Sequence, residues 1–158
     1  MFIKLLTTRS LCLSALIAAL YAALTLLLAP ISYGAIQCRV SEAMTVLPIL
    51  LPQAIPGLFV GCLIANLYTG VITDVIFGSL ATLIAAIGTF LLRKKPLLAA
   101  TCPVLANAVI VGLVRSLTNG WPVALTMLEV GAGEVAAVAL GMLVLLPALK
   151  RIDLTKYF

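Results

Sequence analysis

The chain has 158 residues, of which 64% are hydrophobic and 9% are charged, and its mean hydropathy is +1.28. About a quarter of the residues of a soluble domain are charged, so this composition excludes a soluble globular protein and predicts an integral membrane protein. The net charge of +5 comes from basic residues at the ends of apolar segments, a pattern typical of cytoplasmic membrane anchors and not of a nucleic-acid-binding surface.

Apolar segments follow one another along the whole chain and are separated by Gly, Pro and Asn, the expected punctuation between helices. We expect one all-α membrane domain over residues 1–158, a bundle of six transmembrane helices at about 10–29, 42–55, 56–70, 73–92, 97–117 and 122–149. The first apolar run, from Leu11 to Ala29, has 19 residues. It is longer than the hydrophobic region of a signal peptide, so it is interpreted as a retained transmembrane helix.

The stretch 42–70 could form one kinked span or two short ones. Two spans place both termini in the cytoplasm, with eight basic residues inside and two outside, whereas one span gives at best seven against three. Pro52 and Pro56 also disrupt a helix interior strongly. We therefore predict six helices, the second and third of them short.

Charged and amide side chains gather in the outer half of this predicted bundle. Apart from cytoplasmic anchors and Asp153, the charged residues are Arg39, Glu42, Asp74, Arg115, Glu129 and Glu134, and the amides within helices are Asn66 and Asn107. A charge at the centre of a membrane helix costs about 3 kcal/mol or more, so such residues usually mark a site or pathway. For Arg39 and Glu42, a structural pair and contacts to a ligand remain equally open.

The last predicted helix carries two of these carboxyl groups. Glu129 lies about 10 Å along the helix axis, and no basic residue shares its helix at that depth, which favours a functional role. Glu134 is five positions further, about 140° around the helix, so the two cannot both face one small ligand directly.

The first predicted helix carries Ala15, Ala19 and Ala23 at a spacing of four residues. Small residues at this spacing let two helices approach closely. This stripe could pack inside the bundle or face another protein.

The sequence offers no chemistry for catalysis. It contains no histidine, no HExxH motif and no GxxxxGK[ST] loop. We therefore expect no enzyme, no metal site and no cofactor. Any uphill transport must take its energy from an ion gradient or from partner subunits.

The segment 37–86, QCRVSEAMTVLPILLPQAIPGLFVGCLIANLYTGVITDVIFGSLATLIAA, closely resembles the QueT transporter family. The matching features are RVSEA, AIPGL, GC and AN, then DVIFGSLATL, and later NAVIVGL at 107–113 and GEVAAVALG at 133–141. Members of this family are the substrate-binding S-components of energy-coupling factor (ECF) transporters and are linked to the uptake of queuosine precursors.

The resemblance implies a six-helix bundle with a solute pocket at its outer side, capped by the loop after the first helix. It implies docking on the transmembrane coupling subunit EcfT through small residues of that helix, a role that Ala15, Ala19 and Ala23 match in place and spacing. Two cytoplasmic ATPases would drive the cycle. The expected location is a bacterial cell membrane, with several spans and both termini cytoplasmic.

Queuosine precursors are 7-deazaguanines that carry a cyano or an aminomethyl group. Their N1–H and 2-amino donors can form two parallel hydrogen bonds with one carboxylate. The hypothesis places Glu129 at this donor edge and uses Glu42 or Glu134 to offset an aminomethyl cation. The further candidate contacts to the substrate are Asn66, Asn107, Arg39 and Arg115.

Several alternatives stay open. The ligand could be the cyano base, the aminomethyl base or queuine, or the chain could be an S-component for another vitamin-like solute. An autonomous channel or carrier is the competing class. It would need polar residues through the full membrane thickness, whereas the cytoplasmic half of this chain is almost uncharged apart from its anchors.

Overall fold

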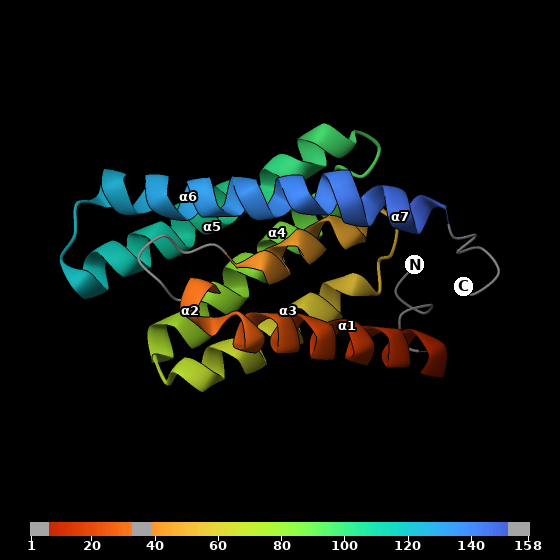
Figure 1. Cartoon of the computed structure of the whole chain (residues 1–158), viewed down its shortest axis with the longest axis horizontal. Helices are drawn as coiled ribbons and strands as arrows, with labels where there is room; N and C mark the ends of the chain where they lie inside the picture. The colour runs from red at the N-terminus through yellow and green to blue at the C-terminus, as the bar shows by residue number, and fades with distance from the viewer. Residues whose placement is uncertain (1–6, 33–38, 152–158) are drawn as a thin grey trace.

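The computed structural model describes residues 7–32 and 39–151, and this part of the chain is helical without any strand (Figure 1). The predicted all-α fold is therefore confirmed. The elements in order are α1 (Thr8–Leu27), α2 (Ala29–Ser32), the 3₁₀ helix η2 (Val40–Ile49), α3 (Ala54–Thr69), the π-helical η3 (Asp74–Gly78), α4 (Ser79–Leu91), α5 (Pro96–Asn119), α6 (Val123–Leu140), the π-helical η4 (Gly141–Leu145) and α7 (Leu146–Lys150).

Four helical stretches are long and apolar enough to cross a membrane: Thr8–Leu27, Asp74–Leu91, Pro96–Asn119 and Val123–Lys150. The apolar helices η2 and α3 have only 10 and 16 residues. At the rises of their helix types they are about 20 and 24 Å long, shorter than a hydrocarbon core of about 30 Å. Helices form in all six predicted regions, but six full membrane spans are not confirmed. The second helix ends at Ile49 instead of the predicted residue 55.

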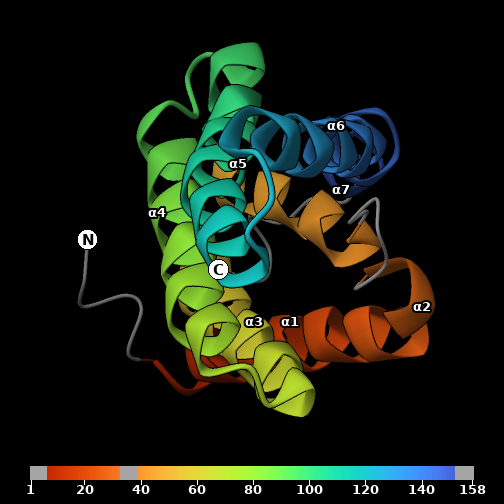
Figure 2. The ribbon, with the colours of Figure 1, turned by 90° about the vertical axis from the view of Figure 1, so that its left-hand side faces the viewer.

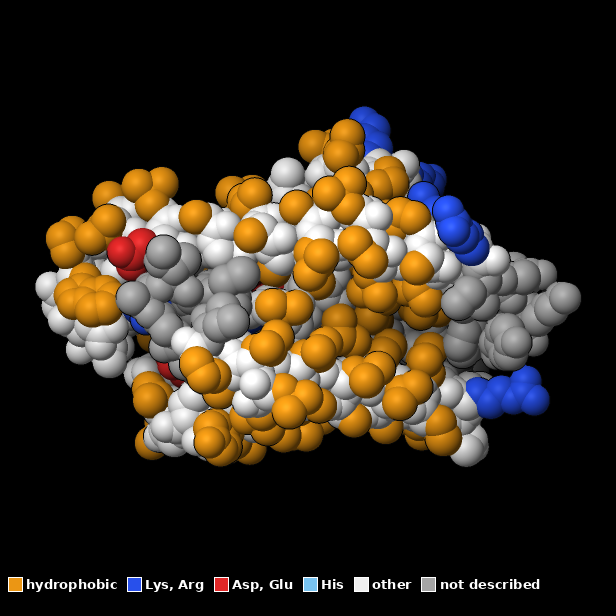
Figure 3. Space-filling view, in the orientation of Figure 1, with side chains coloured by type: hydrophobic (Ala, Val, Ile, Leu, Met, Phe, Trp, Pro, Cys, Tyr) orange, Lys and Arg blue, Asp and Glu red, His pale blue; other side chains and the backbone are white. Residues whose placement is uncertain are grey.

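The bundle has one strongly basic end. The start of α1, the connection from α4 to α5 and the end of α7 lie together there, opposite the loops that follow α3 and α5 (Figure 1). The Lys and Arg side chains of the described residues that lie at this end are Arg9, Arg93, Lys94, Lys95, Lys150 and Arg151 (Figure 3). Basic residues at membrane-helix ends favour the cytoplasmic side, and the cytoplasmic location of this end stays a prediction.

Helix α1 packs on α3 through small residues. A Cβ atom at Gly61 would lie 2.8 Å from the carbonyl oxygen of Ala18, so the two backbones touch at this point. The face of α1 turned toward α3 therefore includes Ala18, and the predicted stripe of Ala15, Ala19 and Ala23 is exposed on another face.

The centre of the bundle is occupied by η2, which contacts α1, α3, α4, α5, α6 and η4 and lies between the α1–α2 and α6–α7 layers in Figure 2. Residues 41–49 of η2 are all buried. Pro48 lacks the N–H that a regular α-helix needs, and ten residues is long for a 3₁₀ helix. A Cβ at Gly141 would lie 2.2 Å from the Ala43 carbonyl oxygen, so the start of η4 crosses η2 in direct backbone contact.

Candidate functional site

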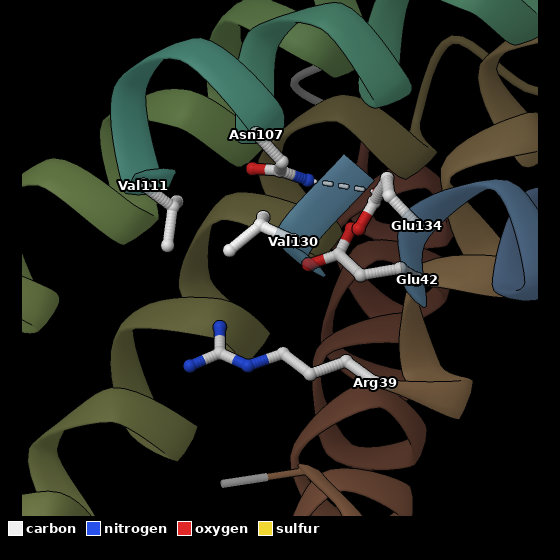
Figure 4. Close-up of a pocket in the computed structure, with 6 residues that line it drawn as sticks. All are labelled: Arg39, Glu42, Asn107, Val111, Val130 and Glu134. Carbon is white, nitrogen blue, oxygen red and sulfur yellow. Dashed lines mark hydrogen bonds between the residues drawn. The ribbon is translucent and has the colours of Figure 1, made fainter. Parts of the chain in front are cut away.

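A small cavity between η2, α5 and α6 brings together buried charged and amide side chains (Figure 4). Its lining residues are Arg39, Glu42, Asn107, Val111, Val130 and Glu134. The space between them has room for about one water molecule. The cavity is therefore polar on one side and walled by two valines on the other.

Hydroxyl groups from two neighbouring helices contact the carboxyl group of Glu42, which is a residue of η2. The Tyr21 hydroxyl of α1 donates to Glu42 Oε1, and the Thr82 hydroxyl of α4 lies 3.4 Å from the same oxygen. The other oxygen, Oε2, is buried and accepts no hydrogen bond from the described residues. An unsatisfied buried acceptor costs about 1–3 kcal/mol, so this oxygen is a ready acceptor for a donor group of a ligand.

Glu134 of α6 and Asn107 of α5 form a second polar pair. Asn107 Nδ2 donates to Glu134 Oε1 at 2.9 Å, and both side chains are buried. Val111 lies one turn beyond Asn107, and Val130 lies one turn before Glu134. Each helix thus presents one polar group and one apolar wall to the cavity.

Arg39 lies just before η2 and is buried, with a second layer of polar groups behind it. Its Nη2 donates to Asn66 Oδ1 at 2.8 Å, while Asn66 Nδ2 donates to the Asp74 carbonyl oxygen at 3.0 Å. Asn66 does not line the cavity and instead orients the guanidinium. The Nη2 atom of Arg39 thus donates to Asn66, while both Arg39 and Glu42 line the cavity.

The structure thus brings Arg39, Glu42, Asn107 and Glu134 to one cavity and leaves three other predicted residues, Asn66, Glu129 and Arg115, outside its lining. Glu129 is partly exposed on α6. The guanidinium of Arg115 lies 5.9 Å from the centroid of the Trp121 ring, a cation–π geometry. The contacts predicted for Glu129 and Arg115 stay predictions from the sequence.

Residues 33–38, which belong to the loop predicted to cap the pocket, lie outside the described residues. Within residues 7–32 and 39–151, no group of three or more His, Cys, Asp or Glu side chains could hold a metal ion.

Sequence reasoning missed Tyr21, which touches Glu42 from α1. A signal for it exists in the sequence. Tyr21 and Thr25 are polar side chains four residues apart within the otherwise apolar stretch 15–27 of α1, and in the structure both are fully buried and bonded to residues of η2. Two buried polar groups on one helical face indicate a polar partner on the neighbouring element.

The helices and the cavity together define a multi-pass membrane protein with a buried polar site. The sequence profile described as QueT transporter matches residues 11–151, and the chain belongs to the QueT transporter family. This confirms the family predicted from segment 37–86.

The chain is also similar to the protein named queuosine precursor transporter QueT from Lactococcus lactis subsp. cremoris (strain MG1363). The two are 42% identical over 72 residues, which are 44% of this chain and 43% of that protein. The matched region thus spans less than half of that relative. No solved structure matches the chain significantly.

Proposed function

We propose that the chain is the S-component of an ECF transporter and captures a queuosine precursor at the outer side of a bacterial cell membrane for ATP-driven uptake. The family and the name of the Lactococcus relative support this proposal. The observation that carries it is the buried Glu42 Oε2, which accepts no hydrogen bond from the described residues and belongs to a side chain that lines a cavity with Glu134 and Asn107.

The lining offers a partner for each edge of a 7-deazaguanine. A carboxylate such as that of Glu42 accepts the N1–H and 2-amino hydrogens as a charge-assisted pair. The five N–H donors of Arg39 include ones suited to O6, and the Asn107 amide can serve either edge. Val111 and Val130 supply apolar contact for the ring. This assignment gives the donor edge to a cavity carboxylate in place of Glu129.

The charges of the lining favour the aminomethyl base over the cyano base. The cavity holds one guanidinium, from Arg39, and two carboxyl groups, from Glu42 and Glu134. The Arg39 guanidinium can balance the charge of one carboxylate, so a second carboxylate has no counter-ion among the lining residues. A protonated aminomethyl group supplies that counter-ion, whereas a cyano group is neutral.

Binding requires the cavity to widen. A bicyclic base is many times larger than the single water molecule for which the cavity has room. We propose that the walls from α5 and α6 move away from η2 when the solute enters. A substantial minority of complexes rearrange in this way when the partners bind.

The proposed partners follow from the same assignment. EcfT would dock on the exposed face of α1 that carries Ala15, Ala19 and Ala23, and two cytoplasmic ATPases would supply the energy. The basic end would face the cytoplasm with both termini, and residues 1–158 would form one membrane domain. The chain itself would catalyse no reaction.

Reconstitution tests this proposal against an autonomous carrier. The chain is placed in proteoliposomes alone or together with EcfT and both ATPases, and uptake of labelled 7-aminomethyl-7-deazaguanine is measured. We expect uptake only with the complete assembly and ATP. Uptake by the chain alone, driven by an ion gradient, would contradict the proposal. Mass spectrometry of the small molecule that co-purifies would reveal a different vitamin-like solute.

A further inference from the structure

We infer that Tyr21 is a positioning residue for the solute site: by holding one carboxyl oxygen of Glu42, it keeps the other oxygen available to the ligand. This inference rests on the proposed function, because it gives Tyr21 a role in binding the same solute. It concerns a residue of α1 that does not line the cavity.

The hydrogen bonds divide the two oxygens of Glu42 clearly. The Tyr21 hydroxyl donates to Oε1, while Oε2 is buried and accepts no hydrogen bond from the described residues. A carboxyl group turns about its last side-chain bond through a broad range of angles. A firm donor on one oxygen therefore fixes the direction in which the other oxygen points.

Tyr21 is the principal donor to Glu42 among the described residues. Thr82 also reaches Oε1, but its single hydroxyl hydrogen has nearer acceptors. The distances are 3.2 Å to the Gly78 carbonyl oxygen and 3.3 Å to Cys62 Sγ, against 3.4 Å to Glu42. Loss of the Tyr21 hydroxyl would leave Oε1 with a weak and shared donor.

A purely structural role for Tyr21 makes a different prediction. The ring is fully buried and belongs to the hydrophobic cluster that includes Leu58 and Ala65. Phenylalanine would fill that space equally well. One turn further along α1, Thr25 Oγ1 lies 2.6 Å from Ser41 Oγ, which is a second bond between α1 and η2 that does not involve Glu42. Thr25→Val is therefore a matched control for the loss of one α1–η2 hydrogen bond.

The test is a double-mutant cycle on the purified full chain in lipid nanodiscs, with the Kd of 7-aminomethyl-7-deazaguanine measured by calorimetry. We expect Tyr21→Phe to weaken binding about tenfold and Thr25→Val less than about twofold. In the Glu42→Gln background, Tyr21→Phe should have no further effect, because Tyr21 acts through the carboxylate. Tyr21→Phe should also shift the pH dependence of the Kd to higher pH, because the hydroxyl stabilises the charged form of Glu42; a loss of packing alone would not cause this shift.

The outcomes separate this inference from the proposed function. The positioning role of Tyr21 is overturned if Glu42→Gln weakens binding but Tyr21→Phe either has no effect or adds its full effect to that of Glu42→Gln. The proposed solute site stands in that case. If Glu42→Gln leaves binding unchanged, both the positioning role of Tyr21 and the proposed solute site fail. An equal loss from Thr25→Val would assign the effect to general α1–η2 packing and overturn the inference. If Tyr21→Phe does not fold, Thr82→Val replaces it and should give a smaller loss that disappears in the Glu42→Gln background.

Discussion

Replacement of Glu134 by glutamine should change which base the chain prefers. Glutamine has the same shape, and its amide oxygen can keep the hydrogen bond from Asn107 Nδ2, which is 2.9 Å long in the wild type. The substitution therefore removes the charge of a buried carboxyl group while it preserves the local packing. A contact to a charged group is worth about 1.5–3 kcal/mol, and each 1.4 kcal/mol is about tenfold in Kd.

We expect Glu134→Gln to weaken binding of 7-aminomethyl-7-deazaguanine by about 10- to 100-fold and binding of the 7-cyano base by less than about threefold. Isothermal titration of both bases against one nanodisc preparation gives the two Kd values and their ratio. An equal loss for both bases would refute the charge argument, because a neutral ligand gains nothing from the carboxylate charge.

Glu129→Gln on the same helix separates the cavity assignment from the assignment made on the sequence. Glu129 is partly exposed and does not line the cavity. The cavity assignment predicts a smaller loss of affinity for Glu129→Gln than for Glu134→Gln. The reverse order would move the site away from the cavity.

Two further predictions concern helix packing. Ala19→Leu on the exposed face of α1 should abolish assembly with EcfT, measured by co-purification, and leave the Kd for the aminomethyl base unchanged. The matched control is Ala136→Leu on the exposed face of α6, which should assemble with EcfT normally. Gly141→Ala should destabilise the chain by about 1–3 kcal/mol, because its Cβ would lie 2.2 Å from the Ala43 carbonyl oxygen. Gly131→Ala places its Cβ 3.4 Å from that of Ala108, an ordinary contact, and should keep or raise the melting temperature. Equal melting temperatures for the two glycine variants would contradict the close crossing of η2 and η4.

Helix boundaries were largely predictable, because they depend on local residues. Gly70 and Gly120 follow α3 and α5 with φ values of +68° and +70°, a backbone conformation that glycine adopts at little cost. The predicted ends at residues 70 and 117 are close to these points. The short 3₁₀ form of η2 was not predicted, because it depends on its packing against six neighbouring elements as well as on Pro48.

Four of the six residues that line the cavity were candidates from the sequence, but the geometry of the cavity was not predictable. Glu129 and Glu134 are about 140° apart around the helix, and the cavity is lined by Glu134 and not by Glu129. The sequence favoured Glu129 as a functional residue because no basic residue shares its helix at that depth. Position along the helix axis does not determine which side chains face the interior of the bundle. The buried residues Thr126, Val130 and Glu134 recur every four positions and mark that inward face. The role of Tyr21 required knowledge of which helix packs beside η2.

The most direct test of the central claim is the affinity of the purified chain for 7-aminomethyl-7-deazaguanine, measured for the wild type and for Glu42→Gln. The account predicts saturable binding by the wild type, stronger than binding of the 7-cyano base, and a loss of about tenfold or more in Glu42→Gln. Equal affinities of the wild type and Glu42→Gln would contradict the account, because Glu42 Oε2 would then make no contact with the solute.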